Sequence, residues 1–453
     1  NNSKEDYQFF KSELAWDESS GYAHWRNRPN KEMPFFSIFN ANVTHESNMW
    51  GTQYKREDHD VFPPPRTAKS QWEKLGYKNY QAYKNDTIPL QVPEDLAVEV
   101  PPYLPQNEIG ENAMRKLYSN IVRMDRFMGI ILQQLEEDGL LEETIIVWYS
   151  DHGGPLPRQK RLLYDSGLRV PLIIRYPNKQ RAGERDDRLI SFVDYPPTLL
   201  SMVGIQPPSY MEGQAFEGKY KVSTPRSYIH GQADRFDERV DLIRAVRNKR
   251  FKYLKNFYTE KPYYLPIAYR ENMEVMQELL RMRDAGELDE NQALWFRTSK
   301  PAEELFDTET DPHELNNLAD DPAYAVVLTD LRTECERWMK AIDDKGFINE
   351  IELIQKFYPN GKPQWSEVPK LTFKGGKITV NASQPGVRIG YKYSNEKAPH
   401  KGWNIYSEPI EEKADDTLEI ITHRLGFKYG ITKVVNGKKL ETHYPLNRHE
   451  LNP

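Results

Sequence analysis

The sequence predicts an α/β protein with a mostly parallel sheet flanked by helices, a smaller α+β subdomain towards the C-terminus, and an appended small all-β sandwich. Three observations predict this class. Apolar strands alternate with a long amphipathic helix before residue 220, strand and helix patterns mix over residues 221–350, and short β-rich runs fill residues 366–453. These three ranges are the domains that we expect.

The first region supplies strands and one long helix. Residues 34–39, 145–150 and 170–175 are apolar runs of strand length. From Met114 to Leu135, apolar residues recur at steps of three and four, which places them on one helical stripe. Residues 50–107 are rich in proline and aromatic residues, which indicates a long irregular segment of the kind that often lines a binding site.

The later regions contain a second amphipathic helix followed by short β-rich runs. A second apolar stripe runs from Tyr324 to Ile342 and contains Cys335, so we expect a core cysteine on a helix. Beyond it, short alternating β-rich runs at residues 377–380, 388–393 and 418–422 favour a small sandwich.

The composition argues against several classes of protein. The 453 residues include 62 Lys and Arg against 68 Asp and Glu, a net charge of −6, which does not favour binding to nucleic acid. No apolar run reaches the length of about 18 residues that a membrane span needs. A single cysteine excludes an internal disulfide framework and a cysteine-rich zinc site.

Four residues stand out as candidates for chemistry. Asp151 and His152 follow a predicted buried strand, Lys160 comes shortly after them, and His45 follows the strand at residues 34–39. Ligand sites of open α/β sheets lie at the carboxyl ends of strands, so these groups are expected to meet around a cation and an anionic ester. The alternative is that Asp151 caps a helix, His152 is satisfied by backbone, and His45 lies on a surface loop.

The order of the motifs resembles a known family. Residues 150–153 and 160–171 are similar to the second signature region of type I sulfatases, which are formylglycine-dependent members of the alkaline-phosphatase-like superfamily. Residues 35–46, 191–200 and 304–318 agree with further family segments in the same order. The resemblance covers roughly residues 20–345 and implies the superfamily's α/β fold.

The resemblance also implies roles. Asp151 and His152 would ligate Ca²⁺, and hard oxygen ligands suit that ion. Lys160 would contact the sulfate oxygens, and His45 would hydrogen-bond the sulfate or protonate the leaving oxygen. The expected activity is that of a sulfuric ester hydrolase that removes sulfate from a sulfated carbohydrate, in the periplasm or outside the cell.

One part of the family pattern is absent. The family's nucleophile is a formylglycine made within a Cys/Ser-x-Pro-x-Arg motif, and no such motif occurs in this sequence. The first methionine is Met33, so we expect that the formylglycine and the remaining calcium ligands lie upstream of residue 1. On this interpretation the chain is the C-terminal part of a sulfatase, and its upstream segment is a partner.

The residues that bind the sugar are predicted from residues 228–238, which resemble a segment of bacterial glycosaminoglycan sulfatases. His230, Asp234 and Arg235 are the candidate sugar-binding residues, with a structural salt-bridge turn as the alternative. Two other functions remain open. One is a two-zinc phosphatase or phosphotransferase of the same superfamily, and the other is a non-catalytic glycan-binding fragment.

Overall fold

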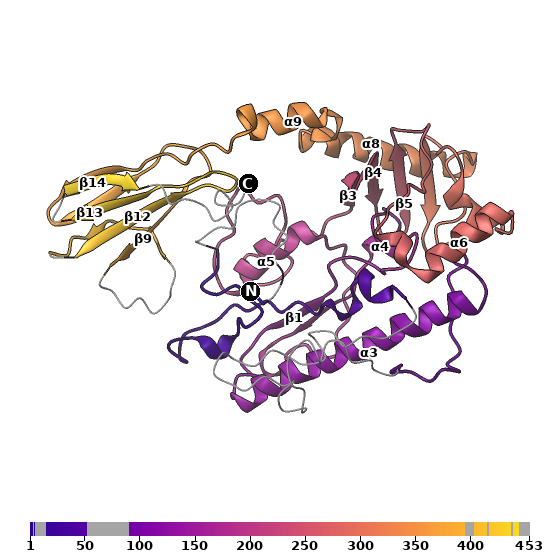
Figure 1. Cartoon of the computed structure of the whole chain (residues 1–453), viewed down its shortest axis with the longest axis horizontal. Coiled ribbons are helices and arrows are strands. Elements are labelled where there is room, and N and C mark those ends of the chain that lie inside the picture. Colours follow the sequence, from indigo (N-terminus) through magenta and orange to yellow (C-terminus); the bar gives the residue numbers. More distant parts are fainter. Residues whose placement is uncertain are drawn as a thin grey trace. The chain divides into compact units, whose positions relative to one another are not determined.

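The computed structural model describes residues 1, 2, 4, 15–51, 90–394, 403–414, 416–435 and 438–443. The chain divides into two compact units (Figure 1). One comprises residues 1–40, 63–76 and 347–453, and the other comprises residues 41–62 and 77–346. Most of the predicted irregular segment 50–107 lies outside the described residues. In the described part of the chain, no helix is long and apolar enough to cross a membrane.

The second unit holds most of the helices. Its α-helices are α3 (Glu108–Glu137), α4 (Asp165–Leu168), α5 (Tyr195–Met202), α6 (Glu274–Ala285), α7 (Glu290–Ala293) and α8 (Ala325–Ala341). Its strands are β1 (Ile146–Tyr149), β2 (Leu172–Arg175), β3 (Ile229–Phe236), β4 (Arg239–Arg247), β5 (Phe251–Asn256) and β6 (Glu303–Asp307). Its 3₁₀ helices are η2 (Asn42–Thr44), η3 (Glu46–Met49), η5 (Pro177–Lys179), η6 (Phe192–Asp194), η7 (Arg270–Asn272), η8 (Leu294–Phe296) and η9 (Pro322–Tyr324).

Helix α3 confirms the long predicted helix. The side chain of Asn107 caps its first turn by accepting hydrogen bonds from the amides of Ile109 and Gly110 at 3.1 and 3.3 Å. The chain leaves the helix through Gly139 at φ +69°, a left-handed conformation that glycine adopts without strain. The buried stripe differs from the prediction in the middle, where Ile121 is 41% exposed and the polar side chains of residues 119, 120 and 123 are buried instead.

Strands β1 and β2 confirm two of the three expected strands but not their direction, whereas residues 34–39 form only the isolated bridge of Phe39 with Asn2. Ile146 pairs with Arg175 and Tyr149 pairs with Leu172, so the two strands run antiparallel. The predicted parallel arrangement is wrong for this pair. Its connection contains only the four-residue helix α4, whereas neighbouring parallel strands are usually joined by a full crossover helix.

A four-stranded antiparallel sheet, in the order β3-β4-β5-β6, forms the predicted α+β region. Successive residues of its strands face opposite sides, and both sides are buried. Val246, Tyr253 and Leu305 pack against α8, where Cys335 is fully buried, as predicted, and burial raises the pKa of its thiol to about 12. The opposite side packs against residues 156–164, and the sheet therefore supports the segment that carries Lys160.

The first unit contains a pair of sheets. It includes the helix α9 (Glu350–Phe357), the 3₁₀ helices η1 (Trp25–Asn27) and η11 (Pro359–Gly361), and the strands β7 (Lys370–Lys374), β8 (Lys377–Asn381), β9 (Arg388–Tyr393), β10 (Asn404–Ile405), β11 (Ile410–Glu411), β12 (Thr417–His423), β13 (Ile431–Val435) and β14 (Lys438–His443). A further 3₁₀ helix, η10, spans Lys345–Phe347. Antiparallel sheets of order β10-β9-β12-β13-β14 and β11-β8-β7 share one apolar core that includes Ile378, Ile410 and Ile420. Two sheets over a common core are the predicted all-β sandwich.

Candidate active site

The loop after β1 is pinned to the segment before β2 by backbone contacts that require glycine. The amide of Gly153 donates to the carbonyl of Gly167 at 2.8 Å, and the amide of Gly154 donates to that of Ser166 at 3.0 Å. A Cβ atom at Gly153 would lie 2.1 Å from the Ser166 carbonyl oxygen. Any larger residue would therefore force the two segments apart. Gly153 and its contact with the segment before β2 thus set the position of Asp151 and His152.

Asp151 and His152 present their polar atoms side by side. The imidazole Nε2 of His152 lies 3.8 Å from Oδ1 of Asp151, whose side chain is 69% exposed. Nδ1 of His152 lies 2.8 Å from the carbonyl oxygen of Gly153. Because a carbonyl only accepts hydrogen bonds, this contact assigns the proton to Nδ1 and leaves the Nε2 lone pair next to the Asp151 carboxylate.

This pair fits two positions in the shell of a cation. Two ligand atoms 3.8 Å apart can both reach one Ca²⁺ ion at about 2.3–2.6 Å. Ca²⁺ takes about six to eight ligands, and within the described ranges no group of three or more His, Cys, Asp or Glu side chains could hold a metal ion. Asp151 and His152 could therefore supply two ligands of such a site, and the remaining ligands would have to come from outside the described residues.

Lys160 is tied to both of the other predicted segments. Its amide donates to the carbonyl of Gly154 at 3.1 Å, and its ammonium Nζ lies 3.7 Å from Oε2 of Glu46. Glu46 is completely buried and directly follows His45. Through these contacts, the loop after β1, the Lys160 segment and the His45 loop meet, which is the convergence that the sequence predicts.

His45 is oriented by its own turn. It is the N-cap residue of η3, and its Nδ1 accepts a hydrogen bond from the amide of Ser47 at 3.3 Å, with the Ser47 hydroxyl at 2.9 Å. An Nδ1 that accepts carries no proton, so the neutral imidazole carries its proton on Nε2. That tautomer has a donor on the side of the ring away from Ser47. The ring of Tyr269 stands edge-on to the imidazole, with centroids 6.2 Å apart.

Side chains of helix α3 contact the residues that follow His45. The buried ammonium of Lys116 donates to the carbonyl of Trp50 at 3.0 Å and also to that of Gly51, and burial lowers its pKa to about 8. The side-chain amide of Asn120 lies 3.7 Å from Sδ of Met49. Lys116 and Asn120 thus hold η3 and the two residues that follow it, whereas the hydroxyl of Ser119 accepts a hydrogen bond from the amide of Gln91.

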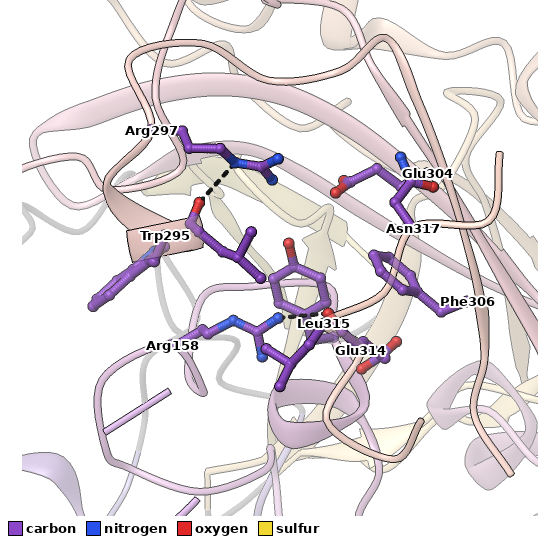
Figure 2. Close-up of a pocket in the computed structure, with 10 residues that line it drawn as sticks. Arg158, Trp295, Arg297, Glu304, Phe306, Glu314, Leu315 and Asn317 are labelled. Atoms are coloured by element: carbon purple, nitrogen blue, oxygen red, sulfur yellow. Dashed lines mark hydrogen bonds between the residues drawn. The ribbon is translucent and has the colours of Figure 1, made fainter. Parts of the chain in front are cut away.

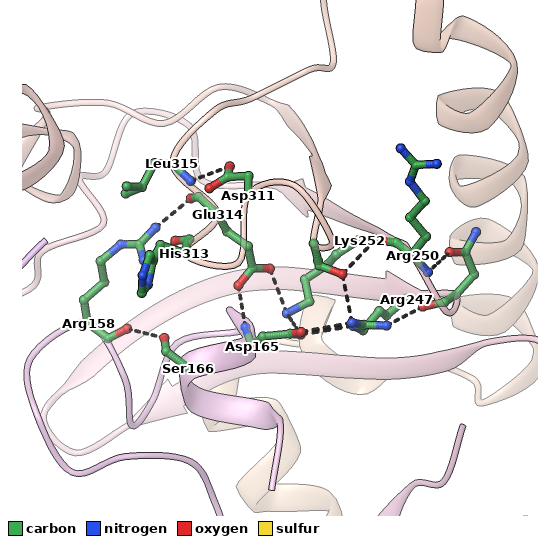
Figure 3. A network of polar contacts seen from close by, with 12 residues as sticks. Arg158, Asp165, Ser166, Arg247, Arg250, Lys252, Asp311, His313, Glu314 and Leu315 are labelled. Atoms are coloured by element: carbon green, nitrogen blue, oxygen red, sulfur yellow. Dashed lines mark hydrogen bonds and ion pairs between the residues drawn. The ribbon is translucent and has the colours of Figure 1, made fainter. Parts of the chain in front are cut away.

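A buried ionic network holds the Lys160 segment on the β3–β6 sheet (Figure 3). Lys252 of β5 pairs with Asp165 and with Glu314 at 2.8 Å, and Arg247 of β4 reaches Asp165 at 3.0 Å. The guanidinium of Arg158 donates to the carbonyls of His313 and Glu314, each at 2.8 Å. The family-like segment at residues 304–318 therefore has a structural role, which is to anchor residues 158–165.

His230 and Asp234 have partners inside the fold. The Nε2 atom of His230 lies 2.8 Å from the carboxylate of Glu334 on α8. The carboxylate of Asp234 pairs with Arg244 at 2.6 Å, and the Arg244 side chain is fully buried. These contacts favour the structural alternative for both residues. A sugar-binding role for His230, Asp234 and Arg235 stays a prediction.

Sequence reasoning missed three charged residues. Arg161 donates to Oε1 and Oε2 of Glu46 at 2.8 and 2.9 Å and pairs on its other side with Asp237 in the β3–β4 turn. The only sequence clue to Glu46 and Arg161 was their position, because they directly follow the candidate residues His45 and Lys160.

A cavity of about 220 Å³ lies beside the anchoring network (Figure 2). The figure shows Arg297 and Glu304 directed toward one another across it. Glu304 is 1% exposed and accepts hydrogen bonds from the Tyr263 hydroxyl and from Asn256 at 3.1 Å. Burial raises the pKa of Glu304 to about 8. This side chain is therefore mostly protonated at neutral pH.

Comparison with known proteins identifies the family of the chain. A family model described as Sulfatase matches residues 1–205, and a model described as N-sulphoglucosamine sulphohydrolase, C-terminal, matches residues 158–293. An ulvan-active sulfatase of Formosa agariphila is 50% identical over 433 residues, which are 94% of this chain and 72% of that protein. The chain belongs to the sulfatase family.

Other sulfatases are less similar. The N-sulphoglucosamine sulphohydrolase of Homo sapiens is 26% identical over 295 residues, which are 61% of this sulfatase chain and 58% of the human protein. A solved structure of a 2-O GAG sulfatase is 21% identical, with a TM-score of 0.40 over 53% of this chain and 45% of that chain. The predicted membership of the sulfatase family is confirmed.

Proposed function

We propose that this chain contributes the Asp151, Lys160 and His45 side of a carbohydrate sulfatase active site and that the complete enzyme hydrolyses a sulfuric ester of a polysaccharide. The observation that carries the proposal is the meeting of three separate segments, with Lys160 3.7 Å from the carboxylate next to His45. The ulvan-active relative, 50% identical, supports ulvan or a similar sulfated polysaccharide as the substrate.

Each residue has a role that its geometry supports. Lys160 places a positive charge against the sulfate oxygens, where negative charge is redistributed as the ester bond breaks. His45 presents an Nε2–H that can hydrogen-bond the sulfate or the departing sugar oxygen. Asp151 and His152 would hold Ca²⁺, which when bound supplies charge compensation and fixes the sulfate group.

The nucleophile is proposed to come from outside these residues. The sequence holds no Cys/Ser-x-Pro-x-Arg motif, so a formylglycine would be supplied by a segment that this chain does not include, together with the further calcium ligands. His230, Asp234 and Arg235 are proposed to face the sugar. By the same family resemblance, we propose a periplasmic or extracellular location.

The test is sulfate release by the full-length protein. Wild type and Lys160→Ala are incubated with ulvan, glycosaminoglycan and aryl sulfate substrates and with the matching phosphate esters, and free anion is measured by ion chromatography. We expect sulfate release by wild type and a loss of about 100-fold or more in Lys160→Ala. Lys249→Ala removes an exposed lysine paired with Asp187 and serves as the matched control.

Two outcomes would reject the proposal. One is a wild type that releases phosphate but no sulfate from the panel, and the other is full activity in Lys160→Ala. The chain alone, assayed beside the full-length protein, is expected to be inactive. Activity of the chain alone would show that the nucleophile lies within it.

A further inference from the structure

Glu46 occupies an unusual place beside the proposed active site. Its side chain has no exposed surface, and both carboxylate oxygens contact cations from consecutive residues of another segment, Lys160 and Arg161. A buried carboxylate without paired cations is strongly unfavourable, so these contacts are required for the fold to accept it. They also join the His45 turn to the Lys160 segment.

The two cations are held differently. Arg161 makes two short hydrogen bonds to Glu46, at 2.8 and 2.9 Å, whereas the Lys160 ammonium stays 3.7 Å away. A separation of 3.7 Å is too long for a strong hydrogen bond, so the attraction holds Lys160 without engaging its N–H donors. Glu46 therefore leaves the donors of Lys160 available to another acceptor. An anionic sulfate is such an acceptor.

The backbone explains how neighbouring side chains reach one carboxylate. Arg161 has φ +77°, a left-handed conformation that is uncommon for residues other than glycine. In an extended chain, residues 160 and 161 would face opposite sides. The left-handed conformation of Arg161 brings both side chains to the same side. The contacts with Glu46 then compensate for the local backbone strain.

Further charges lie around Glu46. Arg270 is 3% exposed, and its pKa is lowered to about 10, first by burial and then by the neighbouring Arg161, while Glu46 and Glu271 oppose the shift. Arg161 is also paired with Asp237. The cations Lys160, Arg161 and Arg270 thus face the carboxylates Glu46, Asp237 and Glu271, and these contacts order the side chains without leaving a net charge.

We propose that Glu46 is a positioning residue for Lys160: it holds the ammonium at the sulfate without binding it tightly. This inference rests on the proposed function. Lys160 has four rotatable side-chain bonds, and holding them in one arrangement keeps the ammonium where charge develops on the sulfate in the transition state. Glu46 does not contact the substrate itself.

The test is a double-mutant cycle in the full-length protein. Glu46→Gln preserves shape and removes the charge, and we expect kcat to fall about 100-fold while the inhibition constant of inorganic sulfate changes less than about threefold. In a Lys160→Ala background, Glu46→Gln is expected to change kcat less than about threefold, because its effect acts through Lys160. Additive losses would overturn the proposal.

A second readout needs no activity. Limited labelling with an amine-reactive ester, quantified at Lys160 by peptide mass spectrometry, reports how well that side chain is held. We expect several-fold faster labelling in Glu46→Gln and no change in Asp237→Asn, which removes the other partner of Arg161. Equal labelling of Lys160 in wild type and Glu46→Gln would overturn the proposal even in a protein without sulfatase activity.

A further variant serves as a control for loss of folding. If Glu46→Gln does not fold, Glu46→Asp replaces it, since the charge is kept and the carboxylate is withdrawn by one methylene. Partial loss of kcat at an unchanged melting temperature supports positioning, and wild-type kcat contradicts it. Sulfate release by wild type separately tests the proposed function, so the two ideas can fail independently.

Discussion

Glu304 gives a prediction about stability that can be worked from the structure. The side chain is 1% exposed, and burial raises its pKa to about 8 from an ordinary value of 4.5. In the unfolded chain this carboxyl is ionised above about pH 4.5, but in the folded chain it keeps its proton until about pH 8. The folded state therefore binds more protons than the unfolded state, and the free energy of unfolding falls as pH rises through this window.

The magnitude follows from linkage. Each pH unit in this window changes the free energy by about 1.4 kcal/mol, so Glu304 lowers stability by up to about 3 kcal/mol between pH 6 and pH 8. Gln at this position keeps the shape and does not titrate. Glu304→Gln is expected to lose about 3 kcal/mol less than wild type over the same range.

Urea denaturation at pH 6, 7 and 8, followed by tryptophan fluorescence, measures this difference. Trp295 lines the same cavity and reports on local unfolding. Asp320→Asn, at an acidic residue outside the network, controls for the general effect of removing a carboxylate. Parallel pH profiles for wild type and Glu304→Gln would refute the assignment of a raised pKa to Glu304.

Three further variants test other parts of the structure. Asp151→Asn should raise the calcium concentration needed to restore activity after chelation with EDTA, and unchanged calcium dependence would remove Asp151 from the metal site. Leu331→Ala should cost about 2–5 kcal/mol in chemical denaturation because Leu331 is fully buried, whereas Val326→Ala, at a residue 82% exposed, should change stability by less than about 0.5 kcal/mol. His230→Gln should reduce acid sensitivity. Burial lowers the pKa of His230, so its contribution to stability is lost as pH falls below about 6.5, and equal acid midpoints would contradict this.

Much of the fold could be predicted from periodicity. The stripe from Met114 to Leu135 and the stripe around Cys335 correspond to α3 and α8, and the β-rich runs form two packed sheets. Strand direction could not be predicted in this way, because an apolar run such as residues 145–150 has the same pattern in parallel and antiparallel pairs. The middle of α3 was missed because its polar residues are buried by contacts with segments far away in the sequence, such as those of Lys116 with Trp50 and of Ser119 with Gln91.

The candidate site was located by motif and refined by geometry. Asp151, Lys160 and His45 were chosen from residue type and position after strands, and their segments do meet. Glu46 could not be chosen in this way, because a lone glutamate after a histidine is usually a solvated residue. Its burial depends on Arg161, whose left-handed backbone no spacing rule predicts.

The close contact between the segments of Gly153 and Gly167 has an evolutionary consequence. A Cβ at Gly167 would lie 2.3 Å from the carbonyl oxygen of Gln159, so selection for a folded protein alone is enough to keep this glycine. A descendant that had lost its ion or its chemistry would still carry the same string of letters. Surveys of genomes that identify sulfatases by this string alone will therefore include proteins that have lost the activity.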